Sequence, residues 1–466
     1  MLLIAVICAL LSTVSFKSVD SLLRPPKNKG DNLELQTAFE AVAGDRYSFK
    51  APISGDYNSS FISVDINGDG DNEVLVFYSD EKSLDSVKIN ILDKINDKWV
   101  SVVDIESDYS DVHKVDFADI NGDGSLEIIL GYSIFETKLT NTLNIYRLDI
   151  KNDTYTAESI FTNSYTDYLV LDINADSIKD LLIFDNPGIN NFIGIKATYF
   201  DFAHSRIYNS GEYLIDPALT SIKSLMFDTD ADSGETRVYV DGYRSDSYMI
   251  TDVFAWDSTV KKFRGCFTAD KKQGISHTVR KFNISCRDTD NDSVVEIPIE
   301  DTLPFDPEFS PENTTGKTVS LIKWSSLDNG ELIPVNYELI NIQKGYSILL
   351  GDDFSPGSYT VKNEADTGLL TFYGFDKPET AHVDKKPKKK KEDNEPPNNE
   401  PSEYSYPEED RLFSVLATPD NDNSLYELSG YRFIKNDNRN SYYCQIYEKG
   451  KVNGLTKEKI KNILIT

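Results

Sequence analysis

The sequence predicts an all-β fold, a β-propeller of about seven four-stranded blades, of which five are clear. An Asp-rich segment recurs five times, at intervals of 53 to 60 residues. A run rich in β-branched and aromatic residues follows each copy, and helical periodicity is nearly absent outside residues 33–43 and 456–463. A unit of about 55 residues cannot bury both of its faces alone, whereas a ring of such units gives each one two neighbours.

Each repeat has apolar residues before its Asp-rich loop and a strand-like run after it. Two further strands are expected in the spacer after each of the first three copies, such as SVKINIL and KWVSVVDI at 86–92 and 98–105. These spacers bring each unit to roughly four strands. The five copies read FISVDINGDGDNEVLVFY, VDFADINGDGSLEIILGY, YLVLDINADSIKDLLIFD, LMFDTDADSGETRVYVDG and NISCRDTDNDSVVEIPIE.

The propeller is predicted to span residues 45–382. After Glu296 the loop motif no longer recurs, but strand-like sequence continues and is expected to form one or two degenerate blades. The runs concerned are TVSLIKW, PVNYELI, YSILL, SYTVK and GLLTFYGF.

The C-terminal part has two predicted segments. Residues 383–408 are rich in Lys, Pro, Asn and Glu with almost no apolar content, which predicts a disordered linker. Residues 409–466 contain RLFSVLATP and SYYCQIYEKG, which predict a C-terminal β segment. This segment either supplies a strand that closes the ring or forms a small appended unit, and the sequence leaves both open.

The N-terminus predicts export. Residues 2–14 form an apolar run of signal-peptide length, so residues 1–16 are interpreted as a signal peptide and 17–44 as an N-terminal segment. No Lys or Arg precedes Lys17, so a truncated start is one alternative and a buried N-terminal strand or helix is another. We expect a secreted or cell-envelope protein, and membrane attachment through a lipid anchor or an uncleaved leader stays open.

The strongly acidic composition limits the kinds of molecule that this chain is expected to bind. The chain has 77 acidic and 48 basic residues, a formal net charge of -29, which disfavours nucleic acid and favours divalent cations wherever carboxylates converge. Beyond Cys8 there are three cysteines and no CxxC, which argues against a thiolate metal site. Whether Cys266 and Cys286 pair is left open.

The Asp-rich loops have the chemistry of a calcium site. In the first loop, oxygen-bearing side chains occupy positions 1, 3, 5 and 9, with Gly70 at a sharp turn, and position 7 can add its carbonyl. Ile66, at position 2, is expected to point into the blade core. Up to five calcium ions are predicted, held by Asp65, Asn67, Asp69, Glu73; Asp119, Asn121, Asp123, Glu127; Asp172, Asn174, Asp176, Asp180; Asp228, Asp230, Asp232; and Asp288, Asp290, Asp292, Glu296.

The five loops are not equivalent, and two other interpretations compete. Ser177 and Ser293 replace the turn glycine, and Thr236 replaces the acid at position 9 of the fourth loop. Asp, Asn and Gly also make tight turns without a metal, but that does not explain four oxygen ligands at fixed spacing in several repeats. An EF-hand is rejected, because it needs Glu at position 12, where the first loop has Val76, and helices on both sides.

DINGDGDNEVLV and DINGDGSLEIIL resemble the FG-GAP or VCBS repeat, the calcium-loop blade of integrin α-subunit propellers and many bacterial surface proteins. The resemblance covers residues 45–300 well and 30–380 loosely, although the Phe-Gly-Gly-Ala-Pro cassette is missing. It implies seven blades and calcium binding, and it says little about partners, because propellers host many functions.

The expected function is an exported, calcium-stabilised binding or structural module that presents a face to a protein or glycan, without catalysis. The four histidines are scattered, and no GxSxG, Walker loop or GxGxxG is present. The alternative is an extracellular polysaccharide hydrolase or lyase with its site at the propeller channel, since carboxylate pairs are abundant.

Overall fold

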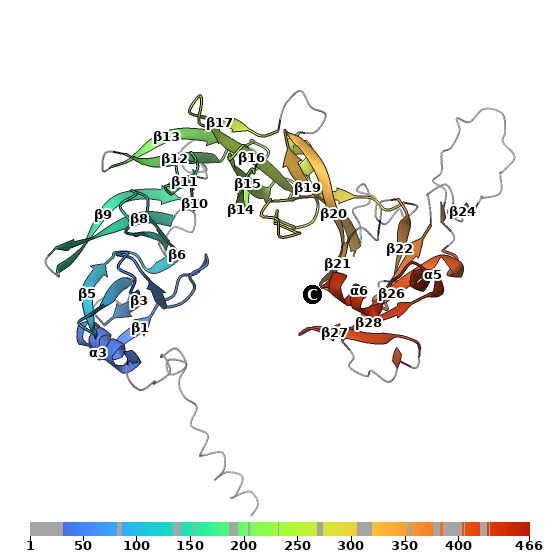
Figure 1. Ribbon diagram of the computed structural model, residues 1–466, viewed down its shortest axis with the longest axis horizontal. Helices are drawn as coiled ribbons and strands as arrows, with labels where there is room; N and C mark the ends of the chain where they lie inside the picture. The colour runs from blue at the N-terminus through green and yellow to red at the C-terminus, as the bar shows by residue number, and fades with distance from the viewer. Residues whose placement is uncertain are drawn as a thin grey trace, which may run out of the picture. The chain divides into compact units, whose positions relative to one another are not determined.

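The computed structural model describes most of the chain, in segments that together hold all the elements given below (Figure 1). The described residues are 31–81, 86–133, 141–151, 154–185, 194–203, 206–231, 233–267, 274–304, 319–351, 354, 357–364, 366–375, 383–384, 403–404, 406–419, 426–427 and 429–466. They divide into two compact units, the first made of residues up to 217 with 233–236 and 255–264, and the second of 218–232, 237–254 and 265–466.

The first unit contains three antiparallel sheets built from consecutive strands. Helix α3 (Asp31–Ala43) precedes the first sheet, which comprises β1 (Tyr47–Phe49), β2 (Phe61–Val64), β3 (Glu73–Asp80), β4 (Lys88–Ile95) and β5 (Lys98–Glu106). Its strand order is β1-β3-β4-β5, and β2 also pairs with β3. The second comprises β6 (Asp111–Ala118), β7 (Glu127–Ser133), β8 (Asn141–Lys151) and β9 (Thr154–Tyr165). The third comprises β10 (Asp167–Leu171), β11 (Asp180–Asp185), β12 (Lys196–Ala203) and β13 (Arg206–Leu214).

A fourth sheet has the same order of four strands, and most of its residues belong to the second unit. It comprises β14 (Ser221–Thr229), β15 (Thr236–Tyr243), β16 (Met249–Asp257) and β17 (Lys262–Gly265). The short 3-10 turn η2 (Ile275–Thr278) follows it.

The second unit also holds two five-stranded sheets. The fifth sheet has the order β18-β19-β20-β21-β29: β18 (Ile297–Asp301), β19 (Val319–Asp328), β20 (Glu331–Asn341), β21 (Tyr346–Leu350) and β29 (Leu464–Ile465). The sixth has the order β22-β23-β26-β28-β27: β22 (Tyr359–Glu364), β23 (Leu369–Gly374), β26 (Arg411–Thr418), β28 (Ser441–Ile446) and β27 (Arg432–Asn436). Three short helical elements, η5 (Glu408–Asp410), α5 (Glu448–Val452) and α6 (Lys457–Ile463), lie in the C-terminal stretch.

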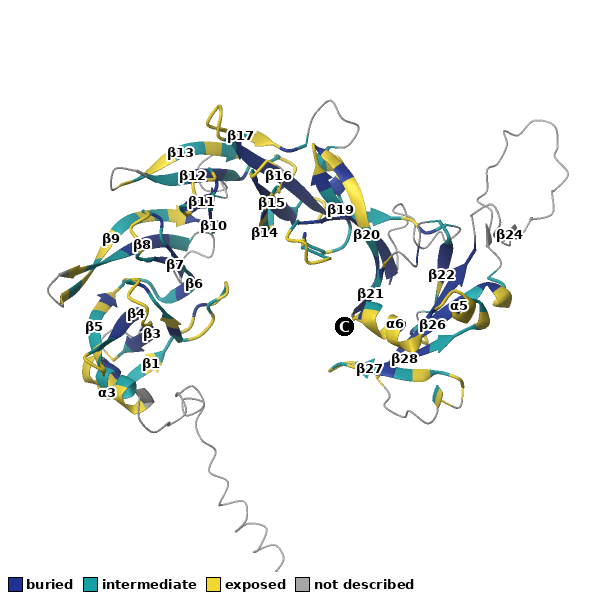
Figure 2. Ribbon diagram, viewed as in Figure 1, coloured by how far each residue is buried: buried dark blue, intermediate teal, exposed yellow. Residues whose placement is uncertain are grey.

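The burial of the strands explains their composition. In the first three sheets, the strand that follows the Asp-rich loop is almost fully buried and reads as a nearly continuous apolar run, as in β3, β7 and β11. The fourth strands, β5 and β9, alternate more and carry exposed positions, because only one side of each is covered (Figure 2). Each sheet is therefore buried in its middle and solvated along its last edge.

Successive sheets share hydrophobic cores within each unit. In the first unit one core joins side chains of the first and second sheets, such as Leu75 and Leu130, and another joins the second and third, such as Ile129 and Ile183. In the second unit a core joins the fifth and sixth sheets through residues such as Ile348 and Phe372. No sheet closes into a barrel among the described strands, so burial depends on sheet-to-sheet packing.

The all-β class and both expected helical runs are confirmed, since α3 and α6 cover residues 33–43 and 457–463. The C-terminal β segment neither stands alone nor pairs with an N-terminal strand among the described residues. Its strand β26 extends the sixth sheet at β23, and β29 pairs with β21. Of the predicted linker 383–408, the structure describes β24 (Val383–Asp384), which pairs with β25 (Glu403–Tyr404), and the stretch from 406 onward.

Three cysteines lie among the described residues. Cys266, Cys286 and Cys444 are buried and none is in a disulfide, so Cys266 and Cys286 are not paired. The predicted signal peptide, with Cys8, lies outside the described residues. None of the described helices is both long and apolar enough to cross a membrane.

Candidate metal sites

The five Asp-rich segments all form loops next to a buried strand. We number them in chain order and count positions 1 to 9 from the first aspartate: loop 1 (65–73), loop 2 (119–127), loop 3 (172–180), loop 4 (228–236) and loop 5 (288–296). Loops 1, 2 and 3 connect the first two strands of their repeat, and loop 5 leads into β18. The acid at position 9 is thus at or beside the first residue of a buried strand.

The aspartate at position 1 organises the loop by accepting hydrogen bonds from the backbone. In loop 1, the two carboxylate oxygens of Asp65 accept from the N–H groups of Gly68 at 2.8 Å and Gly70 at 3.0 Å. In loops 2, 3 and 5 the aspartate at position 1 likewise accepts from the N–H of position 6, and in loops 2 and 5 also from that of position 4. These bonds curl the chain so that alternate side chains turn inward.

The tight curl requires a left-handed backbone at positions 4 and 6. Gly68 and Gly70 have φ of 75° and 94°, values that glycine adopts without strain. The serines that replace the turn glycine nevertheless take the same conformation, with φ of 71° at both Ser177 and Ser293. Loops 3 and 5 therefore keep the loop shape at a cost of about 1–2 kcal/mol for each strained residue.

The acid at position 9 is buried and fixed from one side. Glu73, Glu127 and Asp180 are 0%, 1% and 3% exposed. One carboxylate oxygen of each accepts from the N–H of position 2 of the same loop, at 2.7, 3.0 and 2.9 Å. The isoleucine at position 2 of loop 1, Ile66, is buried in the core, as expected. In loops 1 and 2 the other carboxylate oxygen accepts from the asparagine amide at position 3.

In loops 1 to 3 an asparagine amide lies among the inward-facing acids. The Nδ2 of Asn67 donates to Asp69 Oδ2 at 3.0 Å and to Glu73 Oε1 at 3.2 Å. Asn121 donates to Glu127 at 2.5 Å, and Asn174 donates to Asp176 at 2.9 Å. The amide therefore joins positions 3, 5 and 9 in loop 1, positions 3 and 9 in loop 2, and positions 3 and 5 in loop 3.

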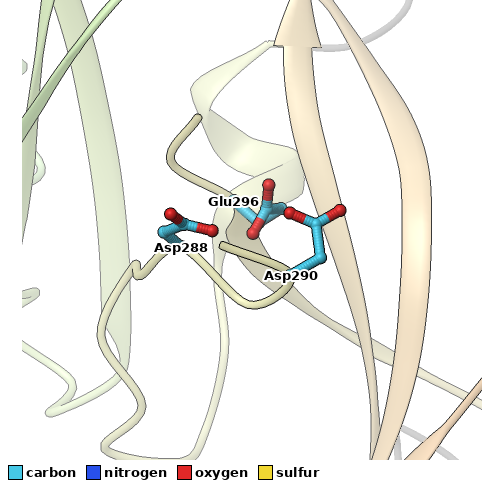
Figure 3. A group of neighbouring side chains, drawn as sticks. All are labelled: Asp288, Asp290 and Glu296. Atoms are coloured by element: carbon cyan, nitrogen blue, oxygen red, sulfur yellow. The ribbon is translucent and has the colours of Figure 1, made fainter. Parts of the chain in front are cut away.

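Loop 5 provides the clearest fit for a cation. It has Asp290 where the first three loops have asparagine, and ligand oxygens of Asp288, Asp290 and Glu296 all lie within 4.8 Å of one another (Figure 3). Glu296 is 0% exposed, and although its Oε2 accepts from Thr289 N and Oγ1, its Oε1 has no hydrogen-bond partner in the described structure. An unpartnered buried carboxylate oxygen among other carboxylates fits a hard cation such as calcium, whose oxygen ligands lie about 2.3–2.6 Å away.

The carboxyl groups at position 9 are electrostatically perturbed. Burial raises the pKa of Glu73, Glu127 and Asp180 to about 7, and neighbouring carboxylates such as Asp69, Asp123 and Asp176 add to the rise. Burial also raises the pKa of Glu296. Without a cation, burial therefore favours the protonated form of each of these four carboxyl groups.

This burial predicts a pH dependence of the metal-free chain. The folded carboxyls hold protons up to about pH 7, whereas unfolded Asp and Glu release them near their ordinary values of 3.8 and 4.5. Because the folded state then binds more protons, stability in a chelating buffer should fall as pH rises from about 4.5 to 7, by on the order of 2 kcal/mol for each of loops 1, 2 and 3. Calorimetric melting at pH 5 and pH 8 measures it.

The matched variant is Glu73→Gln, which removes one of these carboxyls with little change of shape. In chelator at pH 8 it should melt at a higher temperature than the wild type, and at pH 5 the two should agree. A wild-type melting temperature that rises between pH 5 and 8 in chelator would contradict the assignment.

Loop 4 is built differently. Arg237, at position 10, forms two hydrogen bonds to the buried carboxylate of Asp228, at 2.7 and 2.8 Å, and lies 3.4 Å from Asp230. Asp228 also accepts from the Tyr239 hydroxyl and the Val295 N–H. A guanidinium thus lies against the aspartates predicted to bind calcium, and the fourth site receives no support.

The other predicted members of loop 4 do not complete a ligand set. Asp232 lies outside the described residues, and the Thr236 hydroxyl donates to the carbonyl of Asp172 at 2.8 Å. Among the described residues, three predicted acidic ligands come within 4.8 Å of one another in loop 5, namely Asp288, Asp290 and Glu296, and Asp292 is not part of this group. In loops 1, 2 and 3 the predicted ligands touch through the asparagine at position 3. The signals that could have excluded loop 4 are the missing acid at position 9 and the arginine that follows it.

His113 is a half-buried group that the loop motif did not point to. Its Nδ1 lies 2.8 Å from the Tyr165 hydroxyl, and its Nε2 lies 3.3 Å from Ser54 Oγ. The Ser54 hydroxyl donates to the His113 carbonyl at 3.0 Å, and burial lowers the pKa of the imidazole. These contacts link strand β6, which contains His113, to the loop between β1 and β2, which contains Ser54. We therefore assign His113 a structural role.

Comparisons with known proteins add little to this picture. No family model matches the chain, and neither does any curated protein. Among solved structures, the chain is similar to a hypothetical selenium-binding protein from Sulfolobus tokodaii at 9% identity and a TM-score of 0.29, over 46% of this chain. The chain spans about half of that structure, 55% of its length. The fold class and the four loops therefore rest on this chain's own geometry.

Proposed function

We propose that this chain is a calcium-stabilised β-propeller that works as an exported binding or structural module. The observation that carries the proposal is loop 5, where three carboxylates converge around the unpartnered buried oxygen of Glu296. Loops 1, 2 and 3 support it, because they repeat the same backbone hydrogen bonds and the same buried acid at position 9. The propeller interpretation is supported by the face-to-face packing of consecutive four- and five-stranded sheets within each unit.

Calcium in these loops would serve as a scaffold. Each loop is flanked by strands whose apolar residues fill the cores between sheets, so a bound ion fixes the point at which one strand turns into the next. A calcium ion with six to eight oxygen ligands would also neutralise the acids that crowd there. Recognition of a protein or glycan would then fall to other surfaces of the rigid module.

The first test is a calcium stoichiometry. The wild-type chain should bind about four equivalents, one for each loop that keeps its ligand set. Asp119→Ala should bind about one fewer, because Asp119 organises loop 2 through its bonds to Gly122 and Gly124. Equilibrium dialysis with metal analysis measures both.

The matched control is Asp246→Asn, an exposed aspartate paired with Arg244 outside the loops, which should leave the stoichiometry unchanged. A wild-type chain that binds no calcium at millimolar concentration would refute the proposed sites. The partner is then sought by screening the calcium-loaded chain on a glycan array. Turnover of an arrayed polysaccharide, rather than binding, would point to the enzyme alternative.

A further inference from the structure

We infer that, in loops 1, 2 and 3, the charged residue that faces the position-9 acid from the neighbouring strand sets the affinity for calcium, and that loop 2, where this residue is Arg147, is a weak site. The inference rests on the proposed calcium sites. It assigns a tuning role to Asp93, Arg147 and Asp201, which lie outside the loop motif.

The strand register places these residues. Val74 pairs with Leu92, so Glu73 of loop 1 faces Asp93 one position further along. Ile128 pairs with Tyr146, which brings Glu127 of loop 2 opposite Arg147. Leu181 pairs with Phe200, which brings Asp180 of loop 3 opposite Asp201. Facing side chains in an antiparallel pair have Cβ atoms about 5 Å apart.

The electrostatic surroundings agree with the register. Asp93 adds to the rise in the pKa of Glu73 that burial causes, and Asp201 does the same for Asp180. For Glu127, burial again raises the pKa, but Arg147 acts in the opposite direction. A cation already stands beside loop 2, whereas an extra carboxylate stands beside loops 1 and 3.

Each of these residues is held in place by a partner of its own. The Tyr155 hydroxyl donates to Asp93 at 2.5 Å, and the Tyr208 hydroxyl donates to Asp201 at 2.8 Å. Arg147 is paired with Glu158 at 2.7 Å, and its side chain is 34% exposed. The charges are therefore fixed near the loops rather than averaged over the surface.

The consequence for a divalent ion follows from Coulomb's law. A doubly charged ion is attracted by Asp93 or Asp201 and repelled by Arg147, with twice the energy of a single charge at the same distance. Calcium sites tune their affinity through the number of nearby charges in this way. Loop 2 should therefore bind calcium on the order of tenfold more weakly than loops 1 and 3.

The test is a calcium titration of the full-length chain in competition with a chelator of known affinity. The wild type should show one equivalent about tenfold weaker than those of loops 1 and 3, and Asp119→Ala should remove that weak equivalent. Arg147→Gln should tighten it by about tenfold, whereas Arg147→Lys, which keeps the charge, should leave it unchanged. A gain in affinity is a result that general damage to the fold does not produce.

A second arm tests the opposite charge. Asp93→Asn keeps an oxygen that can accept from Tyr155 and should weaken one tight equivalent by about tenfold, without affecting the weak one. Equal wild-type affinities, or an Arg147→Gln titration that matches the wild type, would overturn this ranking while leaving the calcium sites intact. A wild-type chain that binds no calcium would overturn the sites and the ranking together.

Discussion

Removing calcium from the full-length chain is expected to lower its melting temperature by about 10 °C or more. An ion that binds only the folded state adds about 2.7 kcal/mol when its free concentration is 100 times the dissociation constant. Three of the four proposed loops lie in the first unit, and each kcal/mol shifts the melting temperature of a domain of this size by roughly 2–4 °C. Scanning calorimetry in excess calcium and then in excess chelator measures the shift.

Magnesium is the matched control. It demands near-ideal octahedral geometry and gives up its water reluctantly, so it should restore only a small part of the stability lost in chelator. A melting temperature that is the same in calcium and in chelator would remove the scaffold role from the loops. Full restoration by magnesium would show that general charge screening, rather than coordination, stabilises the fold.

Arg237→Met is expected to destabilise the second unit by about 3–5 kcal/mol, because it leaves the Asp228 carboxylate buried without its cation. The Asp228 side chain is 0% exposed, and that of Arg237 is 9% exposed. Arg237 also donates to the carbonyl of Leu327 at 2.6 Å, so the variant breaks a link from β15 to β19 as well. Urea unfolding of the full-length chain, followed by fluorescence and fitted for the second unit, measures the loss.

Two further variants separate charge from packing. Arg244→Gln breaks an exposed ion pair with Asp246 and should cost less than about 1 kcal/mol. The double variant Asp228→Asn with Arg237→Met removes both charges, so it should recover part of the stability that Arg237→Met loses. If the single and double variants were equally unstable, the buried pair would not be the source of the effect.

The repeat and the strands could be predicted from the sequence because both have local causes. Asp and Gly at fixed spacing make the loop turn, and β-branched runs such as VLVFY form the strand that follows. Serine rarely adopts the left-handed backbone that this tight turn requires. The backbone N–H groups of Ser177 and Ser293 nevertheless donate to Asp172 and Asp288, and these hydrogen bonds hold both serines in the turn. Local preference was overridden by the loop as a whole.

The features that the sequence did not reveal depend on register. Asp93, Arg147 and Asp201 lie 20 or 21 residues beyond the acids they face, and only the length of each hairpin decides that they meet. Arg237 is adjacent to loop 4 in sequence, but nothing local shows that its guanidinium turns back onto Asp228. The pairing of β29 with β21 joins residues more than 100 positions apart and has no local signal.

The three buried thiols of the second unit can report how often the surrounding fold opens. Burial raises the pKa of Cys286 and Cys444, and the Cys286 thiol donates to Asp241 at 3.2 Å, so neither presents a thiolate to the solvent. A thiol reagent reacts with the thiolate, so modification has to wait until the surrounding strands separate. The rate of alkylation at each cysteine therefore reports how often its part of the fold opens, from three positions and without any added label.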